Sequence, residues 1–381
     1  MLTARFYPMA NKNSNLGAAK TAKNDEFYTQ YEDIEREMNA YLEYDENVFR
    51  GKTVLLPCDD PEWSNFTKYF AQNFERFGLK KLISTSYAPE SKKIKAWEPT
   101  LFETEAPQYD EDKSKTHGKI FILDSDTNGS GRIDVNDLRW EYLEGDGDFR
   151  SEEVTKLRDE AHIIVTNEPF SLLREFVAWI MEAGKQFSII APQNAITYKE
   201  IFPLIKQNKI WLGNGFHHGD AYFRIPTEGR YSGQEYFDAE AGLVHFRNCC
   251  WFTNIEHGRR HQPLQLMTMA DNIKYSKHKE VKGIGYQHYD NFNAIEVPFT
   301  DAIPSDYYEW MGVPITFLDK YNPEQFEIIG IAKRGPGDPA LRSKFYTASD
   351  YPNYNDLNAT PVIITDGIPH NTYPRILIRK K

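Results

Sequence analysis

The chain has 381 residues, of which 40% are hydrophobic and 14% aromatic, and it carries a formal net charge of −11. These values exclude a disordered chain, and the length favours two lobes because single cores stop growing at about 250–300 residues. The three cysteines form neither a disulfide framework nor a zinc pattern, as is typical of a reducing cytoplasm. No apolar run approaches the roughly 20 residues of a membrane-spanning helix, and no signal-peptide core is present, so we expect no membrane association. The acidic balance is unusual for a nucleic-acid-binding protein, but phosphate contacts need only a local basic face.

The first 30 residues form a polar segment that ends in a motif before a helix. Residues 1–20 are rich in Asn and Lys, and we expect a flexible arm. Residues 24–30 read N-D-E-F-Y-T-Q, and helical spacing follows from Ile34 to Leu42. Asn24 or Asp25 is suited to cap this helix. Taken alone, the motif is a helix cap whose two aromatic residues pack on the core.

Two buried strands follow, separated by a polar turn and a helix. Residues 52–57 and 79–85 are apolar runs that predict strands, and residues 67–77 predict the helix. The turn after the first strand lacks the glycine-rich segment of most nucleotide-binding folds. One of its carboxylates, Asp59 or Asp60, is suited to bind an ammonium group. The alternative is an acidic surface turn.

A short strand at residues 120–123 leads into a loop with a calcium-like pattern. The letters D-S-D-T-N-G at residues 124–129 open like an EF-hand loop. The pattern then fails, because Gly131 stands at the aliphatic position and Val135 at that of the bidentate glutamate. We therefore predict a β-hairpin turn with Gly129 and Gly131 at positive φ, and no metal site.

The centre of the chain is a strand, a polar turn and a helix. Residues 162–166 are a short β-branched run typical of a strand buried on both faces. Pro169 cannot donate to a sheet ladder and ends the strand, and helical spacing follows over residues 171–183. The tetrapeptide N-E-P-F from Asn167 to Phe170 therefore lies at the carboxyl end of a parallel strand, where open α/β sheets hold ligands. An ordinary strand-to-helix turn is the alternative.

Further strands and a basic stretch complete the chain. Strands are predicted at residues 187–190, 210–212, 221–225, 241–246 and 248–254, and a helix at residues 199–207. Between Glu256 and Lys282 the basic residues outnumber three acids, against the acidic character of the whole chain. Such a stretch indicates a DNA-facing surface, although a solvated face is the alternative. The candidate DNA contacts are Arg259, Arg260, Lys274, Lys277 and Lys279.

Several of these segments resemble one family, in the same order along the chain. The tetrapeptide Asn167–Phe170 resembles the Asn-Pro-Pro-Phe/Tyr motif of DNA amino-methyltransferases, with Glu168 in place of the first proline. Similarity to the EcoRI-type adenine-specific DNA methyltransferases extends over N-D-E-F-Y-T-Q, residues 57–66, the Asp148–Phe149 pair and residues 310–327. The resemblance covers nearly the whole chain, from Asn24 to Arg379.

The resemblance implies a fold, a reaction and a cofactor. The fold is a Rossmann-like, doubly wound α/β methyltransferase sheet with a smaller C-terminal DNA-recognition lobe. Residues 1–20 are then a flexible arm, 21–254 the catalytic domain and 255–381 the target-recognition lobe. The enzyme would move a methyl group from S-adenosylmethionine to the exocyclic N6 amine of a flipped-out adenine in duplex DNA. The residues that would hold the cofactor are Phe27, Tyr28, Thr29, Pro57, Asp59, Asp60, Ser86, Asp148 and Phe149.

The resemblance implies that methyl transfer needs no metal and is catalysed by one turn, formed by Asn167, Glu168, Pro169 and Phe170. The Asn side chain and the next backbone carbonyl accept hydrogen bonds from the target amine, and the aromatic ring stacks on the base. A cognate restriction endonuclease is a candidate partner. The rival interpretation is a DNA-binding, cofactor-sensing protein without catalysis, which Glu168 supports. A third, an RNA or small-molecule methyltransferase, leaves the basic stretch without a purpose.

Overall fold

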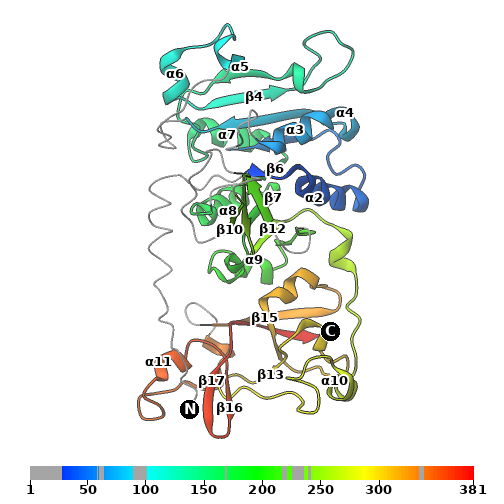
Figure 1. Cartoon of the computed structure of the whole chain (residues 1–381), viewed down its shortest axis with the longest axis vertical. Helices are drawn as coiled ribbons and strands as arrows, with labels where there is room; N and C mark the ends of the chain where they lie inside the picture. The colour runs from blue at the N-terminus through cyan, green and yellow to red at the C-terminus, as the bar shows by residue number, and fades with distance from the viewer. Residues whose placement is uncertain are drawn as a thin grey trace. The chain divides into compact units, whose positions relative to one another are not determined.

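The computed structural model describes residues 28–57, 59, 64–88, 101–167, 170–216, 221–224, 236–238, 242–333 and 339–381 (Figure 1). The chain divides into two compact units. Unit 1 comprises Met1–Arg36, Asn47–Pro192 and Phe216–Cys249, and unit 2 comprises Glu37–Glu46, Gln193–Gly215 and Cys250–Lys381. Among the described residues, no helix is both long enough and apolar enough to cross a membrane.

Six neighbouring strands of a mixed sheet lie in unit 1, in the order β5-β4-β3-β2-β6-β7 (Figure 1). They span Arg139–Tyr142, Lys119–Leu123, Lys81–Ser86, Thr53–Leu56, Ile163–Thr166 and Gln186–Pro192. Strands β3, β2, β6 and β7 run parallel, whereas β4 and β5 are antiparallel to their neighbours. The strands predicted in these regions are confirmed, and the carboxyl ends of the four parallel strands lie at one edge of the sheet.

Burial explains why the central segments are strands. Every residue of β2 and β6 is buried, as expected for parallel strands covered on both faces. The neighbouring helices are α3 (Asn65–Gln72), α4 (Phe74–Phe77), α7 (Glu152–Glu160) and α8 (Leu173–Glu182). The Ser64 side chain caps α3 and the Ser151 side chain caps α7, each by accepting a backbone N–H. The predicted strand and helix around residues 162–183 are confirmed.

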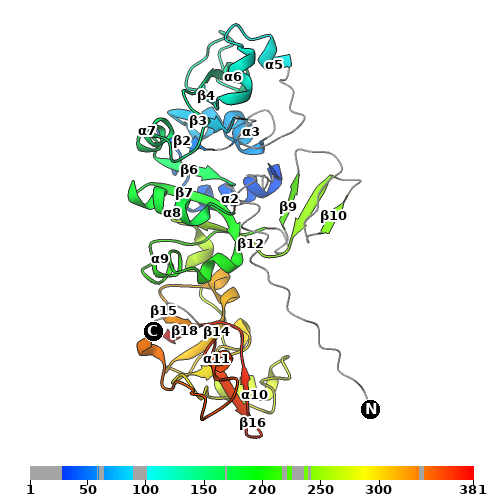
Figure 2. The same cartoon turned by 90° about the vertical axis from the view of Figure 1, so that its left-hand side faces the viewer.

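A second, smaller sheet in unit 1 has the order β1-β9-β11-β10. Its strands span Tyr28–Thr29, Ala221–Arg224, Leu243–Phe246 and Tyr236–Asp238, and all three pairs are antiparallel. Figure 2 shows β9 and β10 as a separate group of strands beside the large sheet. The strands at residues 221–225 and 241–246 were predicted. Their pairing with the N-terminal motif was not, because it joins segments far apart in the chain.

The connection between β4 and β5 forms the predicted hairpin turn. Gly129 and Gly131 have φ angles of +72° and +80°, which side chains other than glycine rarely adopt. The Asp126 carboxylate closes the turn by accepting the N–H groups of both glycines, each at 2.7 Å. Two short helices, α5 (Leu101–Thr104) and α6 (Glu111–Thr116), precede β4.

Unit 2 contains the sheet β13-β14-β18-β15 and the hairpin β16-β17. Their strands span Ile295–Glu296, Met311–Pro314, Arg375–Lys380, Phe326–Ala332, Val362–Thr365 and Ile368–Asn371. Strands β8 (Trp211–Leu212) and β12 (Cys249–Thr253) pair antiparallel. The helices are α9 (Phe202–Lys206), α10 (Met269–Tyr275) and α11 (Tyr354–Leu357), and α2 (Tyr31–Tyr44) runs from unit 1 into unit 2. Helix α9 is shorter than the predicted 199–207, and Pro203 occupies its first turn.

Candidate active site

The carboxyl ends of β2, β3 and β6 are joined by hydrogen bonds into one polar edge. The Thr166 hydroxyl donates to the Pro57 carbonyl oxygen at 2.8 Å, which ties β6 to β2. The Asp59 N–H donates to the Thr85 carbonyl oxygen at 2.6 Å, which ties the turn after β2 to β3. Both threonines are buried. This polar edge lies where open α/β sheets bind ligands.

The carboxylate of Asp59 shapes the turn after β2. It accepts a hydrogen bond from the Ser64 hydroxyl, and it accepts the N–H and the hydroxyl of Thr67 at 3.2 and 2.8 Å. Asp59 is buried, so donors at the beginning of α3 compensate its charge. Any cofactor bound by this carboxylate would share it with those donors. Asp60 lies outside the described residues.

The N-terminal motif lies beside this turn. Strand β1 places Tyr28 opposite Arg224 and Thr29 opposite Phe223 of β9. The Asn65 side-chain amide donates to the Thr29 carbonyl oxygen at 2.8 Å. Two segments expected to hold the cofactor are therefore brought together, although Phe27 itself lies outside the described residues.

Two glycines that sequence analysis did not single out press against the end of β3. A Cβ atom at Gly147 would clash with the Ser86 carbonyl oxygen, and so would one at Gly118. Gly147 also has a φ of +82°, so both the close contact and the backbone conformation require glycine at this position. The Ala88 N–H donates to the Asp146 carbonyl oxygen at 2.8 Å. The loop before α7 therefore lies directly against the end of β3, beside Ser86.

Asp148 and Phe149 have different surroundings. The Arg150 guanidinium binds the Asp148 carboxylate at 2.9 Å through Nε and at 2.6 Å through Nη2, and it also binds Glu175 at 2.9 Å. Asp148 is only partly buried. Phe149 is fully buried, and its ring packs edge-on against Phe176 with 5.1 Å between centroids. The Phe149 ring is therefore part of the core of unit 1.

The segment after β6 leads to an aromatic ring that contacts the small sheet. Asn167 follows β6 directly, whereas Glu168 and Pro169 lie outside the described residues. The half-buried ring of Phe170 meets Phe246 of β11 with 6.1 Å between centroids and 82° between planes. Phe246 packs in turn on Phe223 of β9 at 5.5 Å. Phe170 and Phe246 form a right-angled corner that suits a planar ligand.

A buried carboxylate in unit 2 also escaped sequence analysis. Glu37 accepts hydrogen bonds from the Tyr41 hydroxyl and from the N–H groups of Asn214 and Gly215, the latter two at 2.8 and 3.2 Å. Desolvation by complete burial raises the pKa of Glu37 to about 7, although these hydrogen bonds oppose the shift. A Cβ atom at Gly213 would clash with the carboxylate. Glu37 therefore fixes the path of the loop from residue 213 to residue 215.

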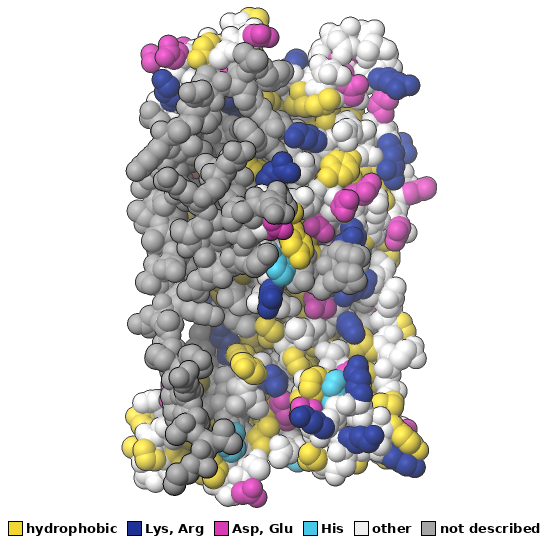
Figure 3. All heavy atoms as spheres, viewed as in Figure 1, with side chains coloured by type: hydrophobic (Ala, Val, Ile, Leu, Met, Phe, Trp, Pro, Cys, Tyr) yellow, Lys and Arg dark blue, Asp and Glu magenta, His cyan; other side chains and the backbone are white. Residues whose placement is uncertain are grey.

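The basic stretch contains exposed lysines. We call Lys274, Lys277, Lys279 and Lys282, all of them exposed, the lysine surface. Figure 3 shows Lys and Arg side chains gathered where Figure 1 draws α10. Lys277 pairs with Asp301 at 2.8 Å. Arg259, by contrast, is half-buried and donates to the Asn214 carbonyl oxygen.

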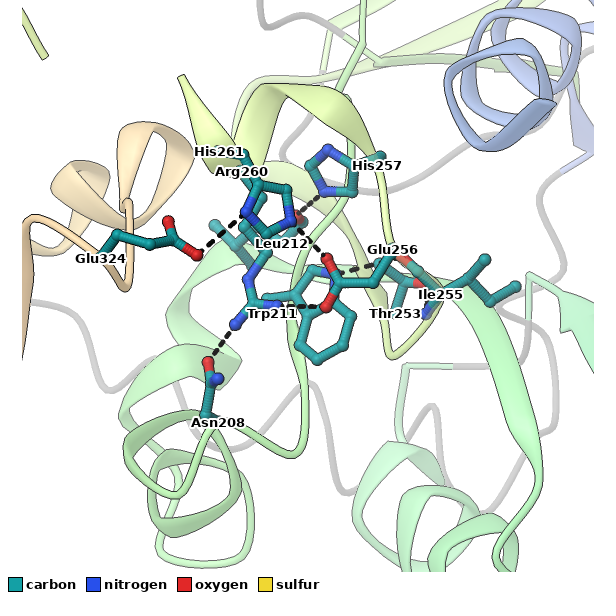
Figure 4. Close-up of polar contacts among 10 residues, drawn as sticks. All are labelled: Asn208, Trp211, Leu212, Thr253, Ile255, Glu256, His257, Arg260, His261 and Glu324. Carbon is teal, nitrogen blue, oxygen red and sulfur yellow. Dashed lines mark hydrogen bonds and ion pairs between the residues drawn. The ribbon is translucent and has the colours of Figure 1, made fainter. Parts of the chain in front are cut away.

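Arg260 lies in the interior of unit 2. It is only 5% exposed, and its guanidinium lies 3.8 Å from the centroid of the Trp211 ring. It donates to Glu256 at 2.7 Å and to the Asn208 side chain, and His261 lies 3.0 Å from the same Glu256 (Figure 4). These contacts give Arg260 a structural role. The sequence R-R-H alone does not indicate which arginine points inward.

The parts of the site define a class of protein. Parallel strands end at a polar edge, loops from three strands meet there, and an amide-bearing turn carries an aromatic ring. This arrangement is typical of α/β proteins that bind a nucleotide-like ligand at the carboxyl ends of their strands. Within the described part of the chain, no group of three or more His, Cys, Asp or Glu side chains is placed to hold a metal ion.

Comparison with known proteins assigns the family. Residues 15–381 match the family described as adenine-specific methyltransferase EcoRI. The Type II methyltransferase M.EcoRI of Escherichia coli is 41% identical over 84% of this chain and 90% of its own. M.MpnI of Mycoplasma pneumoniae is 32% identical over 82% of this chain and 83% of its own, and M.MgeORF184P of Mycoplasma genitalium is 31% identical over 82% and 84%. No solved structure matches the chain.

The chain therefore belongs to the EcoRI family of adenine-specific methyltransferases. The predicted family, enzyme class and function as a DNA adenine methyltransferase are confirmed.

Proposed function

We propose that this enzyme transfers the methyl group of S-adenosylmethionine to N6 of an adenine flipped out of duplex DNA, and that the turn from Asn167 to Phe170 performs the transfer. One observation carries the assignment of the turn: Asn167 follows a fully buried parallel strand, and Phe170 meets Phe246 at a right angle. Because the substrate is cellular DNA, we place the reaction in the cytoplasm.

Positioning of the adenine amine is the main task of the turn. The amine is a poor nucleophile because its lone pair is delocalised into the ring. The Asn167 side-chain oxygen and the Glu168 carbonyl oxygen would accept its two hydrogens and direct the lone pair at the methyl carbon. A bound S-adenosylmethionine would supply the methyl group and leave as S-adenosylhomocysteine, and the methylated nitrogen would release its proton to water. Acceptors placed where positive charge develops stabilise the transition state, and fixed geometry supplies most of the rate.

The aromatic corner would offset the cost of base flipping. Removing a base from the stack costs a few kcal/mol. Stacking on an aromatic side chain returns about 1–3 kcal/mol per base. A base lying on the Phe170 ring would meet the edge of Phe246, and both rings are only half-buried. We therefore assign Phe246 to the base site together with Phe170.

The polar edge fits S-adenosylmethionine, which supplies the electrophilic methyl group when bound. Loops from three strands converge there, and two glycines let the backbone approach closely. We propose a Rossmann-like, doubly wound sheet around this edge. The residues proposed to hold the cofactor are Tyr28, Thr29, Pro57, Asp59, Ser86 and Asp148, with Phe27 and Asp60 as further contacts. The fully buried Phe149 ring is assigned to the core instead.

The lysine surface is the proposed DNA-facing part of the chain. Its cations are exposed in a protein whose net charge is −11, so they provide the local basic face that phosphate contacts need. Arg259 is a further proposed contact. We propose residues 21–254 as the catalytic domain and 255–381 as the target-recognition lobe. Because the relatives are named Type II methyltransferases, a cognate restriction endonuclease is a proposed partner.

Transfer of tritium from labelled S-adenosylmethionine tests this function. The parent protein should label adenine in duplex DNA, and Asn167→Ala should lose about a hundredfold or more in rate. Asn353→Ala, which alters an exposed asparagine of unit 2, is the matched control and should keep the parent rate. Label in another base, label in RNA alone, or an unchanged rate for Asn167→Ala would each overturn the assignment.

A further inference from the structure

A tight turn after α10 holds one isoleucine out into solvent. Ile284 is 67% exposed and stands between Gly283 and Gly285, whose φ angles are +76° and +88°. The turn is well anchored: the Gly283 N–H donates to the Ile273 carbonyl oxygen at 2.8 Å, and the Gly285 N–H donates to the Val281 carbonyl oxygen at 2.9 Å. Val281 is fully buried. These hydrogen bonds therefore hold the turn, with Ile284 at its tip, in a defined conformation.

The surroundings of Ile284 distinguish it from a scattered surface hydrophobe. Lys282 lies two residues before it, and the hydrogen bond to Ile273 brings the tip to the end of α10, beside Lys274. Tyr275 is 59% exposed at the same end of the helix, and Lys274 lies 4.8 Å over its ring. Single exposed apolar residues need no explanation. An apolar tip among cations does, because the same surface would bind phosphates on either side of it.

We propose that Ile284 is an apolar wedge that enters a base step of the bound duplex while the lysine surface holds the flanking phosphates. This inference rests on the proposed action on duplex DNA. Aliphatic side chains inserted between base pairs partly unstack them and kink the duplex. Burial of the exposed isoleucine side chain between bases is favourable because it removes apolar surface from water. The glycines that flank it would let the duplex approach the backbone closely.

The wedge has a purpose in the proposed reaction. Flipping an adenine costs unstacking free energy, and insertion of Ile284 would lower that cost by weakening the stacking of the duplex. The lysines and the isoleucine therefore make different contributions. The lysines govern affinity and its dependence on salt, whereas Ile284 governs distortion of the DNA.

The test measures distortion separately from binding and from methyl transfer. Duplexes labelled at both ends report bending by energy transfer, and 2-aminopurine beside the target adenine reports unstacking. Ile284→Ala should reduce both signals at least about fivefold at saturating protein, with the salt slope of affinity unchanged. Ile284→Leu should restore them. Ile368→Ala, which removes an isoleucine 58% exposed on β17, is the matched control and should behave as the parent.

The outcomes separate the wedge from the proposed function. Parent-like signals from Ile284→Ala, or a parent that binds DNA without distorting it, would overturn the wedge even if the protein methylates adenine. A loss of distortion in Ile284→Ala would support the wedge even if the parent transferred no methyl group. Because the side chain is exposed, an unchanged melting temperature should accompany either result.

Discussion

At the residue scale, substitutions of Glu168 distinguish an active enzyme from a DNA-binding protein without catalysis. Glu168→Pro should keep or raise the single-turnover rate, because proline stiffens the turn and keeps the carbonyl acceptor. Asn167→Ala should lower that rate about a hundredfold or more, because it deletes the other acceptor. Glu168→Gln should slow transfer only if the carboxylate itself stabilises the developing charge. A parent that binds DNA and cofactor but transfers nothing until Glu168 is replaced by proline would be the binding protein instead.

Glu37 predicts a pH dependence of stability. Burial raises its pKa from 4.5 to about 7, so the folded protein binds this proton more tightly than the unfolded chain. The stabilising contribution is fully present below pH 4.5 and is lost as pH rises through about 7. At roughly 1.4 kcal/mol per unit of pKa, the whole effect is about 3 kcal/mol.

Denaturant unfolding at several pH values measures this effect. The free energy of unfolding should fall more between about pH 5 and pH 8 in the parent than in Glu37→Gln, whose amide does not titrate. Glu43→Gln, which alters an exposed glutamate of the same helix, should follow the parent. Parallel curves for the parent and Glu37→Gln would show that the carboxylate keeps an ordinary pKa.

Single residues could be predicted from sequence where local pattern decides their place. The position of Asn167 at a strand end follows from the β-branched run before it and from Pro169 after it, and the structure confirms that the strand ends there. The burial of Arg260 could not be predicted, because Trp211, which its guanidinium covers, lies far away in the chain. Arg150 is close to Asp148 in the chain, but Glu175, which also binds the Arg150 guanidinium, is not, so this three-residue ion pair could not be predicted.

At the element scale, two phenylalanines on different elements should respond oppositely to truncation. Phe149→Ala should lower the free energy of unfolding by about 3–5 kcal/mol, because its ring is fully buried against Phe176. Phe246→Ala should lower kcat/KM for DNA about tenfold, with a smaller effect on stability, because its ring is half-buried at the proposed base site. Thermal unfolding and steady-state kinetics on both variants measure this contrast. If Phe149→Ala weakened cofactor binding and left the free energy of unfolding unchanged, the Phe149 ring would contact the cofactor, as the family resemblance implies.

The elements themselves were predictable to different degrees. Helix α8 spans Leu173–Glu182, within the residues 171–183 over which helical spacing predicts a helix. The small sheet was predictable only as separate strands. Its order depends on pairing between β1 and β9, and nothing in a two-residue strand indicates its partner. The corner of Phe170 and Phe246 joins the segment after β6 to β11, a contact that no local pattern indicates, so the proposed base site could be predicted only in part.

At the scale of the whole molecule, the two units interleave along the chain. Residues Glu37–Glu46 and Gln193–Gly215 belong to unit 2, although the chain enters and leaves unit 1 around them. A shift in composition marks the basic stretch in the sequence, but it does not indicate where the chain passes from one unit to the other. The linear division at residue 254 therefore stays a proposal about function and does not coincide with the compact units.

Charge distribution gives the last prediction. The chain carries −11 overall, so we expect the proposed DNA binding to depend on a local group of exposed cations. Replacing Lys274, Lys277 and Lys279 with alanine should reduce the slope of log affinity against log salt by about 2–3 in magnitude, at about 0.9 per phosphate contact. The lower figure is expected if Lys277 stays with Asp301, since it would then contribute little. Fluorescence anisotropy over a range of salt concentrations measures the slope.

Arg260→Ala provides the contrast within the same stretch. Its guanidinium is buried against Trp211 and Glu256, so this change should lower the melting temperature and leave the salt slope as in the parent. If the triple lysine variant kept the parent slope, the lysine surface would be a solvated face that does not contact DNA phosphates. A reduced slope in Arg260→Ala alone would instead mean that DNA binding draws this arginine out of the interior.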